Sequence, residues 1–272
     1  MKAIGARRVS VLTSVRHIGV GLFSALAELG SARMAPPRDS RDAAHRLAGA
    51  LGAIGRAHDL RVDVRGDIPR GVALIVANHV SYLDPIAIVP TCPALPIAKG
   101  EVLGWPIVGP IGHALGVTFV RRGDPMARAR VLRHIYDLLA AGVPVLNFPE
   151  GTTTDGTRVR AFHRGTFGIA QRLGVPVVPL AIRYRDPALA WCDAATFLPH
   201  YLRTAGRTRV EVSLAFCAAM PPRTGEAPED MAARARNTIQ KTLDRMRWTH
   251  AGTSARLPSS WPDPVLQIVR AS

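Results

Sequence analysis

The stretch N-H-V-S-Y-L-D, residues 78–84, follows the apolar run G-V-A-L-I-V-A of residues 71–77 and precedes P-I-A-I-V-P of residues 85–90. The first run is typical of a buried strand, and the second of a short helix or turn. An Asn, a His and an Asp therefore lie where a buried strand ends. Because ligands bind outside the carboxyl ends of the strands in open α/β sheets, this stretch indicates both a sheet and a site at its edge.

Strand and helix patterns alternate along the chain. Strands are expected at residues 60–66, 71–78, 95–100, 115–122, 143–151 (ending in a turn), 175–184 and 208–216, and helices at 124–142, 164–174 and 227–250. This alternation predicts an α/β fold: a mostly parallel central sheet flanked by helices, with an N-terminal amphipathic helical appendage.

The N-terminal region has its own pattern. Apolar residues recur there at helical spacing, at Val11, Val15, Ile18, Leu22 and Leu26. They predict an amphipathic helix that either lies in the head-group layer of a membrane or packs on the domain. The clean apolar run, residues 18–29, is shorter than the roughly 20 residues that cross a bilayer. Residues 34–42 are typical of a linker, and a second amphipathic helix is expected from near Ser40 to residue 58.

Composition and charge limit the possible classes of protein. The chain has 272 residues, of which 47% are hydrophobic, so it is not a disordered chain. A net charge of +15 indicates nucleic acid, anionic lipid or phosphorylated substrates as partners. No basic stripe interleaved with aromatic residues and no nucleic-acid reader motif is present, so nucleic acid is not expected. Three widely spaced cysteines without a C-x-x-C pair indicate neither a disulfide framework nor a zinc site, and favour a reducing compartment.

His79 and Asp84 are candidates for acid–base chemistry. The Asp can fold back onto the imidazole, orient it and raise its basicity, which leaves the second ring nitrogen to remove a proton from a substrate hydroxyl. The alternative is a hydrogen-bonded histidine beside a helix N-cap residue. Ser81 lacks the G-x-S-x-G context of a nucleophile, and no third residue nearby completes a metal site.

Two further strand ends carry polar residues. In F-V-R-R-G-D, Arg121 and Arg122 follow a strand, and a guanidinium there can hold a phosphate or carboxylate in bidentate fashion. In F-P-E-G-T-T-T-D-G, a tight turn presents Glu150, which can hold a substrate hydroxyl or pair with the arginine. The alternatives are a solvated charge pair and an ordinary polar loop.

The ordered set N-H-V-S-Y-L-D, G-V-T-F-V-R-R, F-P-E-G-T-T-T-D-G and V-P-V-V-P-L-A-I resembles the four sequence blocks of the glycerolipid acyltransferase family, which includes 1-acyl-sn-glycerol-3-phosphate acyltransferases. The resemblance covers residues 65–220. The segment A-K-G-E-V-L-G-W-P-I-V-G, residues 98–109, resembles the family's connecting segment.

The resemblance implies acyl transfer from acyl-CoA or acyl-carrier protein, with no other cofactor and no metal. The implied acceptor is the sn-2 hydroxyl of 1-acyl-glycerol-3-phosphate, and the product is phosphatidic acid. His79 is the implied general base, oriented by Asp84. The implied substrate-binding residues are Asn78, Lys99, Arg121, Arg122, Phe148, Pro149, Glu150, Gly151, Thr152 and Pro179, of which Arg122 binds the acceptor phosphate.

The same resemblance implies a domain organisation and a location. Residues 1–58 are expected to form a helical membrane-associating segment, residues 59–250 the acyltransferase domain, and residues 251–272 a C-terminal tail. The implied partners are an anionic membrane surface, a lysophospholipid and the acyl donor, at the cytoplasmic face of the inner membrane, with a peripheral or monotopic attachment.

Two departures from the family pattern concern the acceptor. Arg121 stands where the family often has Asp or Asn, and Thr153 where enzymes that take phosphate acceptors often have a basic residue or serine. F-P-E-G-T-T also resembles the block of lyso-ornithine lipid acyltransferases, whose acceptor has no phosphate. The alternatives are therefore an acyltransferase for lyso-ornithine lipid or another lysophospholipid, a non-catalytic membrane-surface binding protein, and a serine hydrolase.

Overall fold

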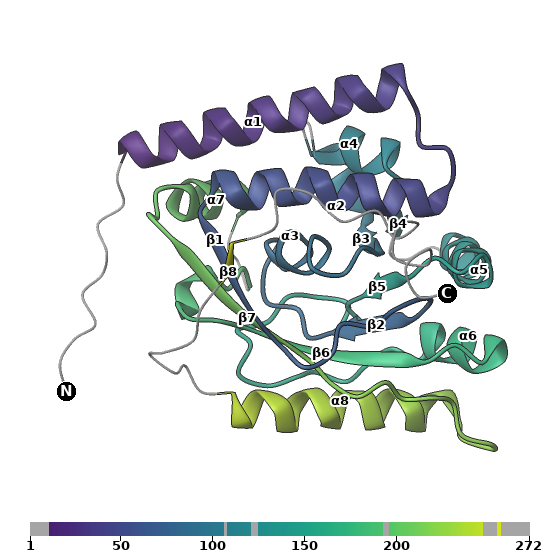
Figure 1. Cartoon of the computed structure of the whole chain (residues 1–272). Helices are drawn as coiled ribbons and strands as arrows, with labels where there is room; N and C mark the ends of the chain where they lie inside the picture. The colour runs from purple at the N-terminus through teal and green to yellow at the C-terminus, as the bar shows by residue number, and fades with distance from the viewer. Residues whose placement is uncertain (1–10, 106–107, 121–124, 193–195, 247–254, 257–272) are drawn as a thin grey trace, which may run out of the picture.

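Within the described residues, eight strands form one sheet in the order β4-β3-β5-β2-β6-β7-β1-β8 (Figure 1). The computed structural model describes residues 11–105, 108–120, 125–192, 196–246 and 255–256. The strands are β1 Leu60–Arg65, β2 Leu74–Ala77, β3 Leu95–Lys99, β4 Thr118–Val120, β5 Val145–Asn147, β6 Val177–Tyr184, β7 Val210–Phe216 and β8 Ala255–Arg256. Only the β6–β7 and β1–β8 pairs are antiparallel, which confirms the predicted mostly parallel sheet.

Helices cover both faces of the sheet. They are α1 Val11–Met34, α2 Ser40–Ala57, α3 Asp84–Ile88, α4 Val108–Ala114, α5 Pro125–Ala140, α6 Gly165–Leu173, α7 Phe197–Ala205 and α8 Pro228–Arg245, with 3-10 helices at Gly100–Gly104 and Pro187–Leu189. Figure 1 shows α2 and α3 on one face and α6 and α8 on the other, with α1 outside α2. A sheet covered on both faces needs strands that are apolar on both sides, as the runs in β2 and β6 are.

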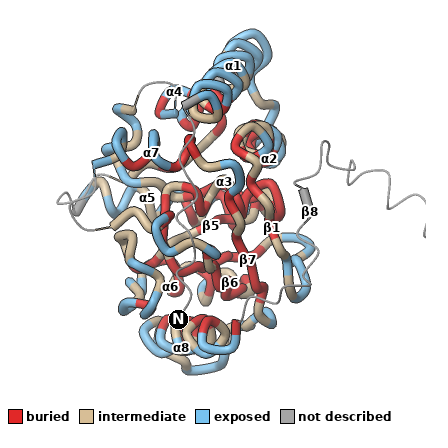
Figure 2. Tube along the Cα trace, turned by 90° about the vertical axis from the view of Figure 1, so that its left-hand side faces the viewer, coloured by how far each residue is buried: buried red, intermediate tan, exposed pale blue. Residues whose placement is uncertain are grey.

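The core lies along the middle strands. All four residues of β2 are buried, as are seven of the eight residues of β6. Figure 2 shows this distribution, with buried residues concentrated in the strands and exposed residues on the outer sides of α1 and α8. Because β2 lies between β5 and β6, its carboxyl end opens onto the loops that follow both neighbours.

The N-terminal helices pack in two layers. As predicted, α2 begins at Ser40, and Asp39 caps it by accepting hydrogen bonds from the backbone N–H groups of Arg41 and Asp42. Its buried face, which includes Leu47 and Ala48, belongs to the main core. Helix α1 contacts α2, α4 and α7. Among the described residues, no helix combines the length and the apolar character needed to cross a bilayer.

Several elements differ from the sequence prediction. Helices α4 and α7 were not predicted, because short segments with glycine or proline show little periodicity. The predicted closing helix ends at Arg245, and residues 247–250 lie outside the described part. The predicted tail, residues 251–272, also lies outside it except for β8, which pairs with β1. The domain boundaries at residues 58 and 250 stay predictions.

Candidate active site

The strand order brings two of the three polar strand ends together. β2 and β5 are parallel neighbours, with Leu74 paired with Val145. The loops that follow them, residues 78–84 and 148–156, therefore meet at the carboxyl edge of the sheet. β4 is separated from β2 by β3 and β5. Arg121 and Arg122, which follow β4, lie outside the described residues.

His79 and Asp84 form the predicted contact. The Nδ1 atom of His79 lies 2.7 Å from Oδ2 of Asp84. Asp84 is the first residue of α3 and is fully buried, whereas the His79 side chain is 22% exposed. With Nδ1 donating to the carboxylate, Nε2 is the nitrogen that can take a proton from a substrate hydroxyl.

Asp84 accepts three more hydrogen bonds. Oδ2 accepts from the backbone N–H groups of Val80, at 2.7 Å, and Ser81, at 3.1 Å. Oδ1 accepts from the hydroxyl of Tyr184 at 2.8 Å. A buried carboxylate that accepts this many hydrogen bonds is held in one orientation. The orientation of the imidazole follows from that of the carboxylate.

The loop after β5 holds the backbone of His79. The N–H of His79 donates to Oε1 of Glu150 at 2.8 Å, and its carbonyl accepts from the N–H of Thr154 at 2.8 Å and from the Thr154 hydroxyl at 3.2 Å. The ring stacks on Phe148, with centroids 4.2 Å apart and planes 20° apart. His79 is thus fixed by its ring face, its backbone and its Nδ1 atom.

Glu150 binds the backbone of two other segments of the protein. Its two carboxylate oxygens accept from the backbone N–H groups of His79 and of Arg160, the latter at 2.9 Å. Burial raises the pKa of Glu150, against the lowering effect of these two hydrogen bonds. Glu150 lies within a turn that is closed by a hydrogen bond from the N–H of Gly151 to the carbonyl of Phe148. Gly151 has a φ of +70°, which favours glycine. Because Arg121 and Arg122 lie outside the described residues, the pairing of Glu150 with an arginine stays a prediction.

The other predicted substrate-binding residues have varied positions. Asn78 continues the β2–β6 pairing, because its side chain donates to the carbonyl of Ile182 at 3.0 Å and accepts from its N–H at 2.9 Å. Pro179 is buried in β6 beside Val76. Lys99 ends β3 and forms a 3.1 Å ion pair with Glu101.

The remaining residues of the third block have different degrees of burial. Pro149 is buried, and Thr152 is half-buried on the loop that passes His79. Ser81, the weak nucleophile candidate, is 0% exposed, and its hydroxyl has no hydrogen-bond partner among the described residues. A hydroxyl so enclosed does not face a substrate.

Tyr184 is a residue that sequence analysis missed. It lies at the end of β6, and its hydroxyl contacts Asp84 across 100 positions of sequence. The only local signal was a polar tip on an aromatic residue at the end of an otherwise apolar strand. Such a hydroxyl needs a partner when it is buried, but the partner's identity depends on strand order.

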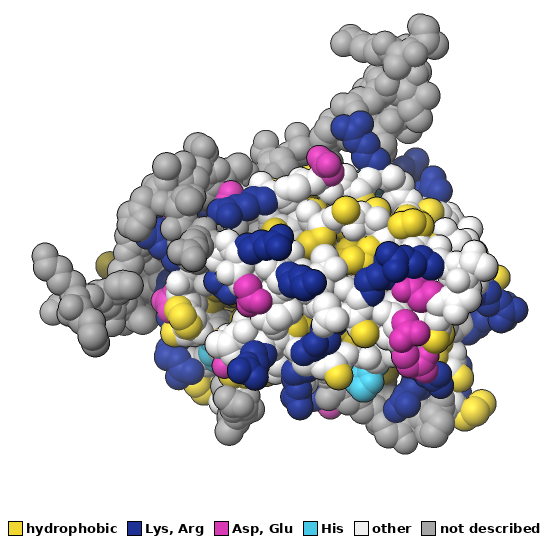
Figure 3. All heavy atoms as spheres, turned by 90° about the horizontal axis from the view of Figure 1, so that it is seen from below, with side chains coloured by type: hydrophobic (Ala, Val, Ile, Leu, Met, Phe, Trp, Pro, Cys, Tyr) yellow, Lys and Arg dark blue, Asp and Glu magenta, His cyan; other side chains and the backbone are white. Residues whose placement is uncertain are grey.

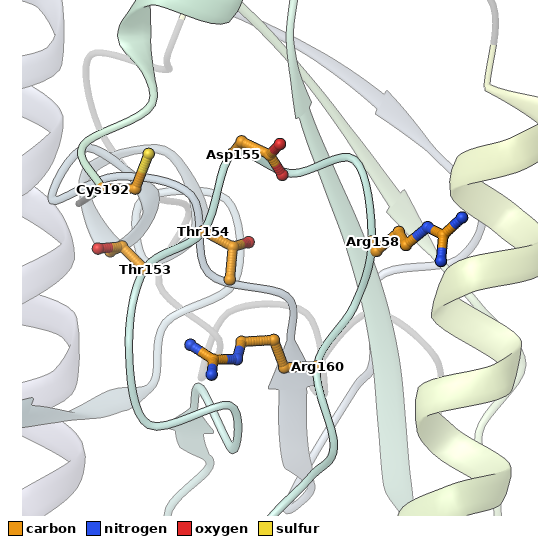
Figure 4. Close-up of a pocket in the computed structure, with 6 residues that line it drawn as sticks. All are labelled: Thr153, Thr154, Asp155, Arg158, Arg160 and Cys192. Atoms are coloured by element: carbon orange, nitrogen blue, oxygen red, sulfur yellow. The ribbon is translucent and has the colours of Figure 1, made fainter.

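A cavity of about 280 Å³ adjoins the loop that holds His79. Its lining residues are Thr153, Thr154, Asp155, Arg158, Arg160 and Cys192. In Figure 4 the guanidinium of Arg160 points toward Thr153 and Thr154, whereas that of Arg158 points away from them. Hydrogen bonds from the N–H and hydroxyl of Thr157 to the Asp155 carboxylate lower the pKa of Asp155. The cavity therefore contains groups of both charge signs.

An aromatic cluster surrounds Tyr82, which lies on the loop after β2. Tyr82 contacts the rings of Trp191, Phe197 and Tyr201, and Trp105 stacks near Phe197 with centroids 4.0 Å apart. The N–H of Trp191 donates to the carbonyl of Val80, which ties the cluster to the loop after β2. In the part of the chain that the structure describes, no three His, Cys, Asp or Glu side chains are placed to hold a metal ion.

Comparison of the sequence with known families adds independent information. The profile of the family described as Acyltransferase matches residues 60–183. A lyso-ornithine lipid O-acyltransferase of Rhizobium meliloti is 31% identical over 209 residues, which cover 69% of this chain and 71% of that protein. A protein of the same description from Pseudomonas aeruginosa is 38% identical over 135 residues, 50% of this chain and 52% of that protein.

Phosphate-acceptor enzymes are also among the similar proteins. A 1-acyl-sn-glycerol-3-phosphate acyltransferase of Neisseria meningitidis is 36% identical over 118 residues, 43% of this chain and 46% of that protein. This chain thus spans about half the length of several curated relatives that it matches. The crystal structure of the 1-acyl-sn-glycerophosphate acyltransferase PlsC of Thermotoga maritima superimposes with a TM-score of 0.66 over 88% of this chain and 97% of that one. At 24% identity, this likeness shows the fold.

Proposed function

This chain belongs to the glycerolipid acyltransferase family, and we propose that it transfers a fatty acyl group from a thioester to the hydroxyl of a lysolipid. The observation that carries the proposal is the 2.7 Å contact between a partly exposed His79 and a fully buried Asp84 at the carboxyl edge of the sheet. A base with an orienting carboxylate suits an alcohol nucleophile, and the mechanism needs no covalent enzyme intermediate.

The proposed mechanism has two steps. Nε2 of His79 removes the proton of the lysolipid hydroxyl while the oxygen attacks the thioester carbonyl, forming a tetrahedral intermediate. The intermediate collapses with cleavage of the carbon–sulfur bond, and the protonated His79 returns the proton to the leaving thiolate. Asp84 stabilises the imidazolium between the two steps. The products are an ester and a free thiol, carried by coenzyme A or by acyl-carrier protein, and no other cofactor takes part.

The first proposed acceptor is 1-acyl-glycerol-3-phosphate, whose sn-2 hydroxyl would be acylated to give phosphatidic acid. The similarity to the 1-acyl-sn-glycerol-3-phosphate acyltransferase of Neisseria meningitidis supports this choice. Within the cavity, Arg160 supplies a cation for a phosphate. Arg121 and Arg122 are the further cations predicted from the second block.

The second proposed acceptor is a lyso-ornithine lipid, whose head group carries a carboxylate and an ammonium group. The Pseudomonas and Rhizobium relatives support it. The cavity supports it as well, because it contains the carboxylate of Asp155 in addition to the guanidinium of Arg160. An acidic side chain repels a phosphate dianion but pairs with an ammonium group.

We propose that the protein works on a membrane, attached peripherally at the cytoplasmic face of the inner membrane. Helix α1 has exposed apolar side chains, including Leu12, Phe23 and Leu26. The charge of +15 favours an anionic surface. Figure 3 shows basic side chains spread over the face that includes α8, with acidic side chains between them. This face lies on the side of the molecule opposite α1 (Figure 1), so its charge adds to the long-range attraction of the whole protein to an anionic surface and is not part of the α1 contact. Its mixed signs do not make the continuous basic groove of a nucleic-acid binder.

The reaction is tested with purified protein, labelled acyl-CoA or acyl-carrier protein, and each acceptor presented separately in liposomes. Since positioned proton transfer contributes about 10²–10⁴-fold, we expect His79→Ala to lose about that factor in kcat. His134→Ala, on the exposed side of α5, is the matched control and should keep wild-type turnover. Absence of turnover with every donor and acceptor, or full activity of His79→Ala, would contradict the proposal.

A further inference from the structure

Tyr184 reaches the His79–Asp84 pair because β6 is longer than β2. The two strands pair in parallel up to Ala77 and Leu180. Asn78 then bonds to the backbone of Ile182 in place of a further strand residue. Tyr184, two residues after Ile182, therefore lies beyond the end of β2 and contacts Asp84, the first residue of α3.

The two oxygens of Asp84 have unequal surroundings. Oδ2 accepts from Nδ1 of His79 and from two backbone N–H groups, whereas Tyr184 is the donor recorded for Oδ1, at 2.8 Å. Asp84 is 0% exposed and Tyr184 is 6% exposed, so water does not readily replace this bond. The hydroxyl of Tyr184 therefore sets both the rotation of the carboxylate and the share of negative charge left to attract the imidazole.

We propose that Tyr184 is a positioning residue of the catalytic pair. By donating a hydrogen bond to Oδ1, its hydroxyl weakens the electrostatic attraction of Asp84 for the proton on His79, so that His79 acts as a base at lower pH. The inference rests on the proposed function, in which His79 is the base. Tyr184 remains a donor over the working range, because burial and the nearby Asp84 charge raise its pKa well above 10.

The sign of the effect follows from the charge on Asp84. Removing the Tyr184 hydroxyl takes away the hydrogen bond that the described residues donate to Oδ1 in a buried site, so the pair binds a proton more tightly. The pair then stays protonated to higher pH, and the acid limb of the kcat/KM profile moves to higher pH. A hydrogen bond to a charged group corresponds to a shift of about one pH unit, and to about tenfold lower activity on that limb. The KM for the acceptor should stay the same, because Tyr184 is buried behind Asp84.

The first experiment compares pH–rate profiles of Tyr184→Phe and wild type, with thermal unfolding recorded for both. Tyr201→Phe is the control, since it removes a different tyrosine hydroxyl, which lies 3.2 Å from Nε2 of His58 and does not bond to Asp84. We expect the acid limb to move to higher pH in Tyr184→Phe and to keep its wild-type position in Tyr201→Phe. A uniform loss of rate at all pH values, with no movement of the limb, would show a merely structural role and overturn the proposal.

A second variant reverses the sign. Replacing Tyr184 by 3,5-difluorotyrosine makes the hydroxyl a stronger donor, and we expect the acid limb to move to lower pH. This result supports the proposal even if Tyr184→Phe does not fold. An unchanged or raised limb with this analogue would overturn it. In an Asp84→Asn background, Tyr184→Phe should produce no further movement of the limb, because the effect acts through the carboxylate.

A readout without turnover separates this inference from the proposed function. The Nδ1 proton of His79 should give a downfield proton resonance that disappears in Asp84→Asn. The midpoint of its pH titration should move to higher pH in Tyr184→Phe and to lower pH with the difluoro analogue. If wild type turns over no acceptor, the proposed function fails, while this titration still decides whether Tyr184 tunes the pair. A titration that is the same in all three proteins would overturn the inference.

Discussion

At the scale of single residues, Asp155 bears most directly on the choice of acceptor. It lines the cavity at the loop after β5 together with Arg160. Its pKa is lowered by the hydrogen bonds from Thr157, so it is ionised at neutral pH. A carboxylate and a guanidinium that line one cavity complement a head group that has one negative and one positive group.

Substitution of Asp155 should separate the two acceptors. We expect Asp155→Asn to lower kcat/KM for lyso-ornithine lipid by about tenfold, the value of one charge-assisted hydrogen bond, and to leave lysophosphatidic acid unaffected or slightly improved. Arg160→Gln should weaken both acceptors, because both are anionic in part.

The matched control is Arg245→Gln, which removes an exposed cation at the end of α8, outside the lining of this cavity. It should change neither acceptor by more than about twofold, since exposed charges at a distance are screened. Equal losses for both acceptors in Asp155→Asn would show that Asp155 supports the loop and does not select the head group.

At the scale of elements, buried histidines join α1 to the rest of the molecule. Nδ1 of His17 lies 3.0 Å from the carbonyl of Ala205 in α7, and its ring lies 5.5 Å from that of His58, which ends α2. Burial lowers the pKa of both histidines, and the pKa of His58 is lowered further by His17. Arg16 also lowers the pKa of His17, whereas the neighbouring Asp59 raises it.

These shifts predict that acid weakens the packing of the N-terminal helices. Burial in the native state favours the neutral form of both imidazoles, whereas in the unfolded state they bind protons below the ordinary histidine pKa of 6.5. Since the unfolded state binds more protons, the free energy of unfolding falls as pH drops from about 6.5 to the lowered native values.

Urea unfolding at pH 7.5 and 5.5 measures this effect. We expect His58→Gln to show a smaller loss of stability between the two pH values than wild type does. His113→Gln, at an exposed histidine of α4, should show the full loss. An identical pH dependence in His58→Gln and wild type would assign the loss to other groups.

At the scale of the whole molecule, α1 forms an outer layer with an apolar outer surface. The exposed fractions are 83% for Leu12, 64% for Val15, 76% for Phe23 and 50% for Leu26. The opposite side of α1 contacts α2, α4 and α7, so this apolar surface faces outward (Figure 1). Exposed apolar side chains on a basic protein suit an anionic lipid surface.

The double variant Leu12→Glu/Phe23→Glu should reduce binding to vesicles that contain anionic lipid. Each large apolar side chain contributes about 1.5–3 kcal/mol when fully buried, so even partial insertion of two predicts a loss of at least about tenfold in vesicle affinity. Cosedimentation measures the affinity. Met126→Glu, at a 66% exposed residue of α5, is the control for added charge on an apolar position.

Activity on a short-chain acceptor dissolved in water provides the second readout for this variant. We expect it to be unchanged, because the active site lies at the sheet edge and does not include α1. Vesicle binding that survives the double substitution would mean that another surface docks on the membrane. Binding by the charge of the protein alone would instead be lost in high salt.

The local parts of this protein were predictable from the sequence. The alternation of strands and helices depends on periodicity within each segment, and the predicted elements from Leu60 to Arg245 agree with the structure apart from short helices such as α4 and α7. The His79–Asp84 contact was also predictable, since the two residues are five positions apart on one loop. Short sequence separation leaves few alternative geometries, so residue spacing is informative.

The tertiary structure alone decided which distant residues join that pair. Strand order places β2 between β5 and β6, and no local pattern specifies that order. It brings Glu150 and Thr154 to the backbone of His79, and Tyr184 to Oδ1 of Asp84. Local spacing was therefore enough to predict the fold class and the contact between His79 and Asp84. Only the folded chain determined the residues that orient the pair, because their contacts depend on which strands become neighbours.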